Sequence, residues 1–174
     1  MATRYHNISG ELTQELLAAG DNIKVSSISL SNTGTGNSHY GTKVDLYIEK
    51  KLTGKFYILK GVSIPIGTTL THDFSMNNSA GEFGLYIKLT KPDTFTLTGT
   101  IDVTGTNTNV PGTGTVFLTE LSIGDEIVVT GETRVIDNII SDTAATVSVA
   151  WGSDLANDLT PDCNPEAFID VIIS

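Results

Sequence analysis

The chain is poor in cysteine, in charge and in long apolar runs. Its single cysteine, Cys163, excludes an intrachain disulfide, and its neighbours Asp162 and Glu166 oppose thiolate formation, so we expect an incidental free thiol. No apolar run approaches the ~18–20 residues that cross a bilayer. The first residues lack the apolar core of a secretory signal. We therefore expect a soluble protein made in a cytoplasm, with no membrane partner.

Basic residues are almost absent from the second half. Up to Asp93 there are nine Lys or Arg against eight Asp or Glu, a net charge of +1. From Thr94 onward there is one, Arg134, against twelve, a net charge of −11. Pro92 and Asp93 favour a turn at this point. The sequence thus predicts two domains, residues 1–93 and residues 94–174.

The overall charge of −10 argues against nucleic acid as a partner, because phosphate binding depends on Lys and Arg. The only local basic concentration comprises Lys50, Lys51, Lys55 and Lys60. Lysines beside a hairpin are usually a solvated face or protect an edge strand from pairing. We expect no nucleic-acid partner.

The first half carries strand signals. Val44, Leu46 and Ile48 alternate with Asp45, Tyr47 and Glu49, the pattern of a half-buried antiparallel strand. Residues 10–19 fit either a short helix or an extension of a strand. The pattern predicts an N-terminal antiparallel β-sandwich of six to eight strands, with signals at residues 22–32, 43–50, 55–62, 68–74 and 84–89.

The second half reads as a series of short strands between tight turns. Residues 94–104 form a one-sided apolar row, and the Gly, Asn and Pro of residues 105–114 predict a loop. Strands at 126–130, 133–140 and 145–150 predict a meander that closes into a small C-terminal β-barrel-like domain. The apolar segment 167–173 is expected to be its last strand and to fill its core.

No residues stand out as catalytic, as cofactor-binding or as metal ligands. His6, His39 and His72 are scattered, and no nucleophile elbow surrounds a serine. The Gly-rich stretches at 34–36 and 112–114 precede no helical pattern, so we interpret them as turns rather than phosphate loops. Trp151 fits buried packing at a strand end better than a ligand anchor.

An acidic segment is the one candidate for metal binding. Asp154, Asp158, Asp162 and Glu166 lie in a stretch without strand signals, and calcium prefers several oxygen ligands. Their spacing of four differs from the alternating ligands of an EF-hand. A solvated acidic loop is therefore favoured over a calcium site, and no metal is expected.

Two regions resemble bacteriophage proteins. Val44-Asp-Leu-Tyr-Ile-Glu and residues 55–70 resemble β-sandwich modules in virion proteins of tailed bacteriophages, particularly those of cyanobacterial myoviruses. Residues 112–129, with 131–136, 141–143 and 147–151, resemble a small β module that recurs in phage structural proteins. Together they cover about two thirds of the chain, and neither family has catalytic residues to transfer.

The resemblance implies a non-enzymatic virion structural protein, either a capsid decoration (cement) protein or a neck or tail accessory. It would be assembled in the host cytoplasm, contact other virion proteins and form a homo-oligomer, with a trimer or a ring as the expected form. Residues 1–93 would dock to the particle, and residues 94–174 would lie further out. The alternative is a tail fibre or baseplate attachment module that binds a host receptor or glycan. An enzyme is a distant third, because no acid–base pair or metal set stands out.

Overall fold

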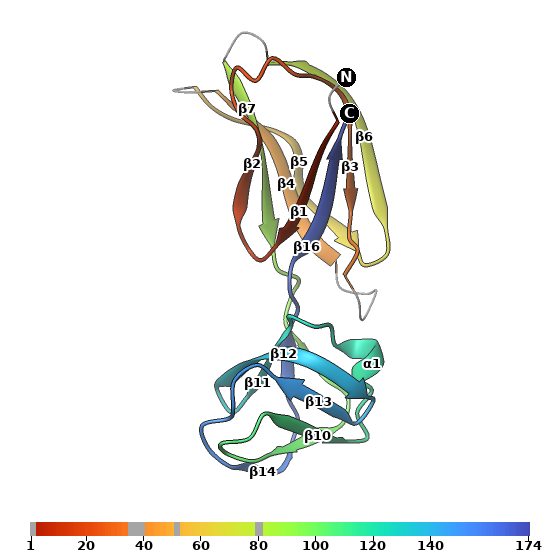
Figure 1. Cartoon of the computed structure of the whole chain (residues 1–174), viewed down its shortest axis with the longest axis vertical. Helices are drawn as coiled ribbons and strands as arrows, with labels where there is room; N and C mark the ends of the chain where they lie inside the picture. The colour runs from red at the N-terminus through yellow and green to blue at the C-terminus, as the bar shows by residue number, and fades with distance from the viewer. Residues whose placement is uncertain (1–2, 35–40, 51–52, 79–81) are drawn as a thin grey trace. The chain divides into compact units, whose positions relative to one another are not determined.

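The computed structural model describes residues 3–34, 41–50, 53–78 and 82–174, and it is an all-β protein with antiparallel sheets (Figure 1). It divides into two compact units. The first contains the described residues up to Gly34 together with Gly41–Lys91 and Ala167–Ser174; the second contains Pro92–Glu166. The second unit is thus inserted between two strands of the first. No helix formed by the described residues is long and apolar enough to cross a bilayer.

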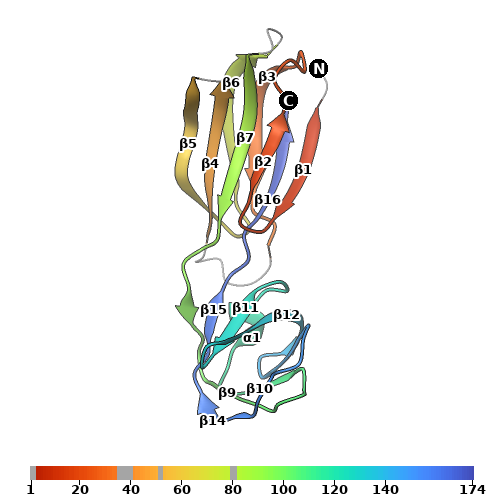
Figure 2. The ribbon, with the colours of Figure 1, turned by 90° about the vertical axis from the view of Figure 1, so that its left-hand side faces the viewer.

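The first unit consists of two four-stranded sheets around one core (Figure 2). One sheet has the order β1 (Arg4–Ser9), β16 (Phe168–Ile173), β3 (Lys24–Ser31), β6 (Thr69–Asn77). The other has the order β2 (Thr13–Leu17), β7 (Phe83–Thr90), β4 (Gly41–Lys50), β5 (Gly54–Pro65). Every strand in the two sheets is antiparallel to its neighbours.

The predicted alternation positions the core of this unit. Val44 and Leu46 on β4 are fully buried, as are Ile28 and Leu30 on β3, so each sheet turns one face inward. The chain passes from one sheet to the other after Pro65, where β5 ends and where Pro provides no ladder N–H. Residues 13–17 form strand β2, so the strand interpretation of residues 10–19 is confirmed and the helix is wrong.

The predicted assignment of residues 167–173 to the second domain is wrong. Strand β16 lies between β1 and β3 and buries Ile169, Val171 and Ile173 in the core of the first unit. The apolar pattern identified a buried strand but contained no information about which sheet it joins. Its partners are far away in sequence, as in the pairing of Ile8 with Ile169.

The two ends of the first unit that flank the insertion lie near each other. Thr42 on β4 is fully buried, and its hydroxyl lies 3.1 Å from the backbone N–H of Phe168, at the start of β16. The next residue, Lys43, pairs with Thr90 at the end of β7. The chain therefore leaves and re-enters this unit beside the same end of β4.

The second unit is one sheet of eight short strands with one helical turn, α1 (Phe117–Glu120). The strand order is β14 (Leu155–Leu159), β9 (Thr100–Val103), β10 (Asn109–Thr113), β13 (Ala144–Val147), β12 (Glu132–Ser141), β11 (Glu126–Val129), β15 (Asp162–Asn164), β8 (Phe95–Thr96). The predicted meander is confirmed as β11-β12-β13. The order is open: among the described residues, no pairing closes β14 onto β8.

The second unit has its own core, which includes Phe117, Ile127 and Trp151. The turn between β11 and β12 consists of Thr130 and Gly131, both with positive φ, one residue earlier than the predicted Gly131-Glu132. The predicted loop 105–114 contains strand β10, which tolerates Pro111 within it. Strands β14 and β15 likewise lie in the segment expected to have no strand.

Candidate functional site

A row of three tyrosines crosses the outer face of the β2-β7-β4-β5 sheet. Tyr86 on β7 and Tyr57 on β5 are both directly opposite Tyr47 on β4. The ring centroid of Tyr47 lies 5.6 Å from that of Tyr86 and 5.5 Å from that of Tyr57. Aromatic pairs at these separations on neighbouring strands stabilise a sheet. The adjacent residues Leu46 and Ile87 are fully buried in the core, so the tyrosines lie on the opposite face of the sheet.

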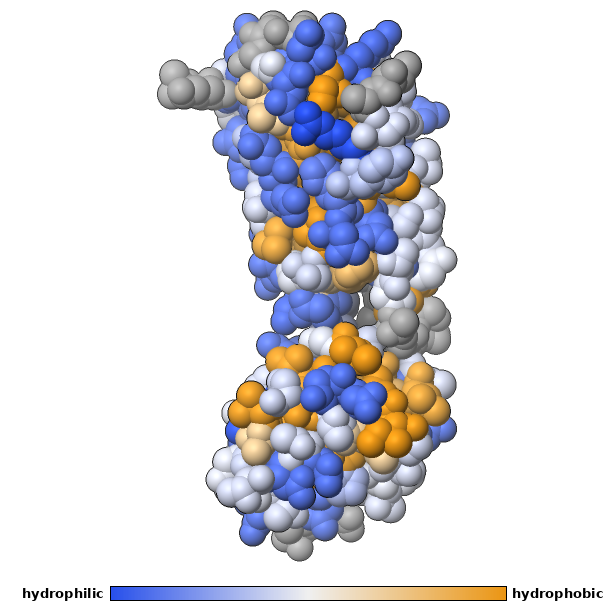
Figure 3. All heavy atoms as spheres, in the orientation of Figure 1, coloured by the Kyte–Doolittle hydropathy of each residue, from blue (hydrophilic) through white to orange (hydrophobic). Residues whose placement is uncertain are grey.

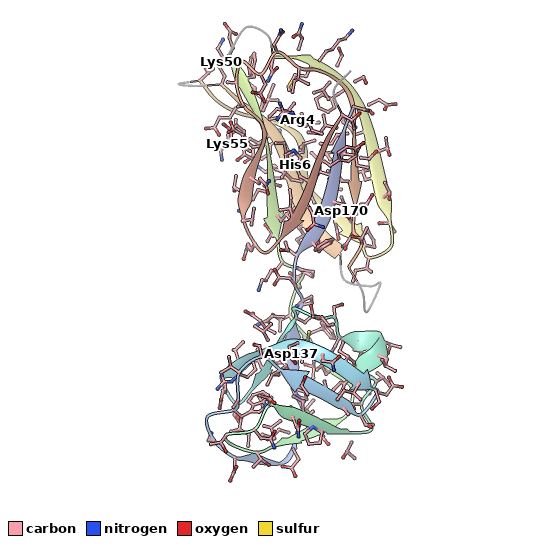
Figure 4. The ribbon with its side chains drawn as sticks, in the orientation of Figure 1. Arg4, His6, Lys50, Lys55, Asp137 and Asp170 are labelled. Atoms are coloured by element: carbon pink, nitrogen blue, oxygen red, sulfur yellow. The ribbon has the colours of Figure 1, made fainter. Side chains whose placement is uncertain are left out.

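Two lysines cover this row. Lys55 Nζ lies 4.5 Å from the ring centroid of Tyr47, and Lys60 Nζ lies 4.8 Å from that of Tyr57. Lys55 Nζ also donates a hydrogen bond of 3.2 Å to the Tyr47 hydroxyl, and this bond is the main reason why the pKa of Lys55 is raised. The rings attract and orient both ammonium groups. Figure 4 labels Lys55, which projects from this side of the unit.

Tyr86 is fixed from the other end of the row. Glu15 on β2 is directly opposite Tyr86 and accepts a 2.8 Å hydrogen bond from its hydroxyl. This hydrogen bond, with burial second, raises the pKa of Tyr86 to about 12. Gly84 makes room for the ring, because a Cβ at that position would lie 2.7 Å from a ring carbon of Tyr86. The row is thus held in place across all four strands.

We call Tyr47, Tyr57, Tyr86, Lys55 and Lys60 the lysine–tyrosine face. Tyr57 is 45% exposed and both lysines are exposed, whereas Tyr47 is buried beneath them. The face therefore offers aromatic area and two oriented ammonium groups. Tyrosine is enriched in protein interfaces because it combines a rigid apolar ring with a polar end. Such a face can bind a partner non-covalently.

The second unit presents a different surface. Leu118, Ile140 and Val149 are 56%, 62% and 62% exposed, and Val135 and Asp137 are exposed on the same strand as Ile140. These positions belong to α1, to β12 and to the segment after β13. Helix α1 contacts β12, and the Ser148 N–H donates a hydrogen bond to the Val135 carbonyl. Figure 3 shows apolar side chains gathered around hydrophilic ones on this unit. We call Leu118, Val135, Asp137, Ile140 and Val149 the acidic–apolar face.

A buried carboxylate, Asp125, joins two segments of the second unit. It is 4% exposed and accepts backbone hydrogen bonds of 2.8 Å from Ser122 and from Glu166. Burial raises the pKa of Asp125 to about 6, although these hydrogen bonds oppose the shift. Its role in the structure is to tie the turn before β11 to the segment after β15.

The cysteine lies beside this carboxylate. Cys163 is fully buried on β15, and its sulfur lies 3.8 Å from Asp125 Oδ2. Burial, with Asp125 as the next cause, raises the pKa of the Cys163 thiol. A thiol that stays protonated in this way is a poor nucleophile.

The two histidines that the structure describes lie on different strands. His6 lies on β1, where burial and then the Arg4 charge lower its pKa. His72 lies on β6 and stacks on Phe74, with ring centroids 5.9 Å apart. His39 lies outside the described residues. Figure 4 labels His6 and Arg4 on the first unit.

The acidic segment considered for calcium is dispersed. Asp154 accepts a hydrogen bond from the Gly105 N–H, Asp162 accepts one from Thr96, and Glu166 packs its backbone against Asp125. The residues that the structure describes contain no group of three or more His, Cys, Asp or Glu able to hold a metal ion. The side chain of Asp158 is outside this description.

Trp151 is 1% exposed, with the Arg134 guanidinium 5.6 Å from its ring centroid. Its predicted burial is confirmed, but its predicted place at a strand end is wrong, because β13 ends at Val147.

Sequence reasoning missed both exposed faces. The alternation placed Tyr47 on the outer side of β4, but only the pairing with β5 and β7 brings Tyr57 and Tyr86 beside it. The available signal was a tyrosine at an outward position of three separate strands. Lys55 and Lys60 are exposed on the edge strand β5, in line with the predicted solvated or edge-protecting role, and they also lie over tyrosine rings.

In comparisons with known proteins, no family model, no curated protein and no solved structure matches the chain.

Proposed function

We propose that the protein is a non-enzymatic structural component of a tailed-bacteriophage virion, a capsid decoration (cement) protein or a neck or tail accessory. It acts through repeated contacts with other virion proteins, as a homo-oligomer, with its first unit docked to the particle. In this proposal the first unit is the β-sandwich module, and the second unit, an open sheet of short strands, is the small β module. Symmetric assemblies multiply modest contacts, so each copy needs no deep binding site.

The observation that carries the proposal is that charge and structure divide at the same place. The first unit holds nine Lys or Arg and eight Asp or Glu, whereas the inserted unit holds one and twelve. A near-neutral unit approaches a partner surface without like-charge repulsion, whereas a unit of −11 repels other anionic particles and favours an outward position. The insertion keeps the docking unit and the outward-lying acidic unit within one chain.

The outer face of the β1-β16-β3-β6 sheet is suited to such docking. It carries cross-strand hydroxyl pairs, Ser29 with Thr71 at 3.1 Å and Ser31 with Thr69 at 2.9 Å. Hydroxyl groups lose less hydration free energy than charges when they are covered.

The test removes the inserted unit and keeps the first unit whole. Residues 92–166 are replaced by a Gly/Ser linker of about ten residues, which joins β7 to β16 beside Thr42. We expect this variant to be incorporated into particles at the same copy number as the full chain, measured by cryo-electron microscopy and mass spectrometry of purified particles. If neither the full chain nor the variant is incorporated into particles, the proposal is refuted. If the full chain is incorporated and the variant is not, docking by the first unit is refuted. Circular dichroism of the purified variant serves as the folding control.

The alternative, an attachment module of a tail fibre or baseplate, is favoured by one observation. Phe56 and Tyr57 on β5 are 50% and 45% exposed, and exposed aromatic rings are common in sites that bind saccharides or proteins. Under this alternative the copy number would be that of a fibre or baseplate component, and particles with a Tyr57→Ala variant would adsorb to host cells more slowly. Equal adsorption by that variant would exclude this face as the receptor site.

A further inference from the structure

The two exposed faces differ in charge and share an apolar character. The lysine–tyrosine face presents the Lys55 and Lys60 ammonium groups above partly exposed rings. The acidic–apolar face presents Asp137 among exposed aliphatic side chains. The inserted unit as a whole carries −11, so its field attracts cations over its surface.

Each face has a feature of a specific interface rather than of ordinary surface. On the lysine–tyrosine face, stacking and the Lys55–Tyr47 hydrogen bond fix side chains that would otherwise lose conformational freedom on binding. On the acidic–apolar face, β12 is irregular, with register shifts between Ile136 and Asn138 and between Ile139 and Ser141. These shifts leave Ile140 exposed beside α1. Clustered exposed aliphatic groups with a polar rim are typical of protein contacts.

We infer that the lysine–tyrosine face of one copy binds the acidic–apolar face of a second copy. This inference rests on the proposed function, because it names the partner surfaces of the homo-oligomer. Charge complementarity selects the occupant. Aliphatic groups of one copy cover the tyrosine rings of the other, and Asp137 approaches the exposed Lys60 ammonium group. Lys55 already lies directly opposite Glu49 on β4, so Lys60 is the ammonium group of this face that pairs with a carboxylate of the second copy.

The contact is heterologous, since the two faces belong to different units of the chain. A heterologous contact leaves one face of each kind free on every dimer, so association continues until a ring closes or a filament grows. An isologous contact would stop at two copies. This difference supplies the decisive test.

The experiment measures self-association of the purified full chain by sedimentation equilibrium. The variants are Lys60→Glu on the first face and Asp137→Lys on the second. Lys24→Glu is the matched control for Lys60→Glu, and Asp102→Lys is the matched control for Asp137→Lys. Each control changes an exposed strand residue in the same unit as its test variant and makes the same change of charge. Far-ultraviolet circular dichroism checks that each variant is folded.

We expect the full chain to associate, and the dissociation constant to rise about tenfold or more in each test variant but not in either control. About 0.5 M salt should weaken association of the full chain in the same direction, since it screens exposed charges. An equimolar mixture of Lys60→Glu and Asp137→Lys should associate more strongly than either variant alone, because each mixed pair has one intact face of each kind and the two reversed charges attract where the altered faces meet.

Three results overturn the inference: a chain that stays monomeric at millimolar concentration, association equally weakened by the controls, or a mixture that stays monomeric. A chain that is present in particles but monomeric in solution refutes the self-contact alone. A chain absent from particles refutes the proposed function, whatever its self-association.

Discussion

Titration of Asp125 should make the second unit less stable as the pH rises through the weakly acidic range. The folded state holds this carboxyl at a pKa of about 6, above the 3.8 of an exposed aspartate, because burial disfavours the charged form. Between these two values the folded state binds a proton that the unfolded state has released. The stabilisation is therefore complete below the unfolded pKa and is lost as the pH rises through the folded one.

The magnitude follows from the shift. A difference of roughly two pKa units corresponds to about 3 kcal/mol of unfolding free energy, at ~1.4 kcal/mol for each unit. The Asp125→Asn variant removes the titration. It also leaves one of the two backbone donors, Ser122 or Glu166, facing an amide N–H₂, which costs about 1–3 kcal/mol at every pH. The variant is thus less stable throughout but lacks this pH dependence.

Trp151 makes the measurement specific to the second unit. It is the only tryptophan of the chain and is buried in that unit's core, so its fluorescence reports unfolding there. Urea unfolding of both chains is followed from about pH 4 to about pH 7, and the free energy of the variant is subtracted from that of the wild type. We expect the difference to fall by about 3 kcal/mol across this range. A difference that is constant or rises with pH would refute the assignment of a raised pKa to Asp125.

Two further predictions concern the architecture of each unit. Deleting Ala167–Ser174 should unfold the first unit. The burial of Ile169, Val171 and Ile173 contributes about 1.5–3 kcal/mol each to the free energy of unfolding, against a typical domain stability of ~5–15 kcal/mol. Persistent protection of the β1 and β3 amides in hydrogen exchange would contradict this prediction. In the second unit, Gly99→Ala should cost more than about 2 kcal/mol in urea unfolding, because its φ is +79° and a Cβ would lie 2.5 Å from the Thr113 carbonyl oxygen. Gly114→Ala, at φ +67° with open space around it, should cost only about 1 kcal/mol, and equal costs would disprove the steric argument.

Local patterns in the sequence predicted most strands of the first unit. Where side chains alternate over six or more residues, as on β3 and β4, burial alone specifies the conformation. Strand β1 was missed, since its one deeply buried side chain is Ile8. In the second unit β10 and β15 were missed because three to five residues containing Pro, Gly or Asn give no period. Their pairing is determined by neighbouring strands.

The charge of the chain predicted the division into units better than the strand pattern did. In the structure the acidic second unit ends at Glu166. The single acidic residue after it, Asp170, accepts hydrogen bonds from Asn7 and Thr33 in the first unit. The first boundary lies within two residues of the predicted one. The return of the chain after residue 166 had no local signal, because an apolar strand is compatible with either core.

The two exposed faces could not be predicted from the sequence, whereas the cores could. A core residue is marked by its own polarity and by its period along one strand. The lysine–tyrosine face requires Glu15, Tyr47, Tyr57 and Tyr86 from four strands to align in one register. The sheet that holds this face shares its core with the opposite sheet, which β16 completes only after the inserted unit has been passed. Displacing β16 should therefore weaken binding at the lysine–tyrosine face as well as stability, even though β16 contributes no residue to that face.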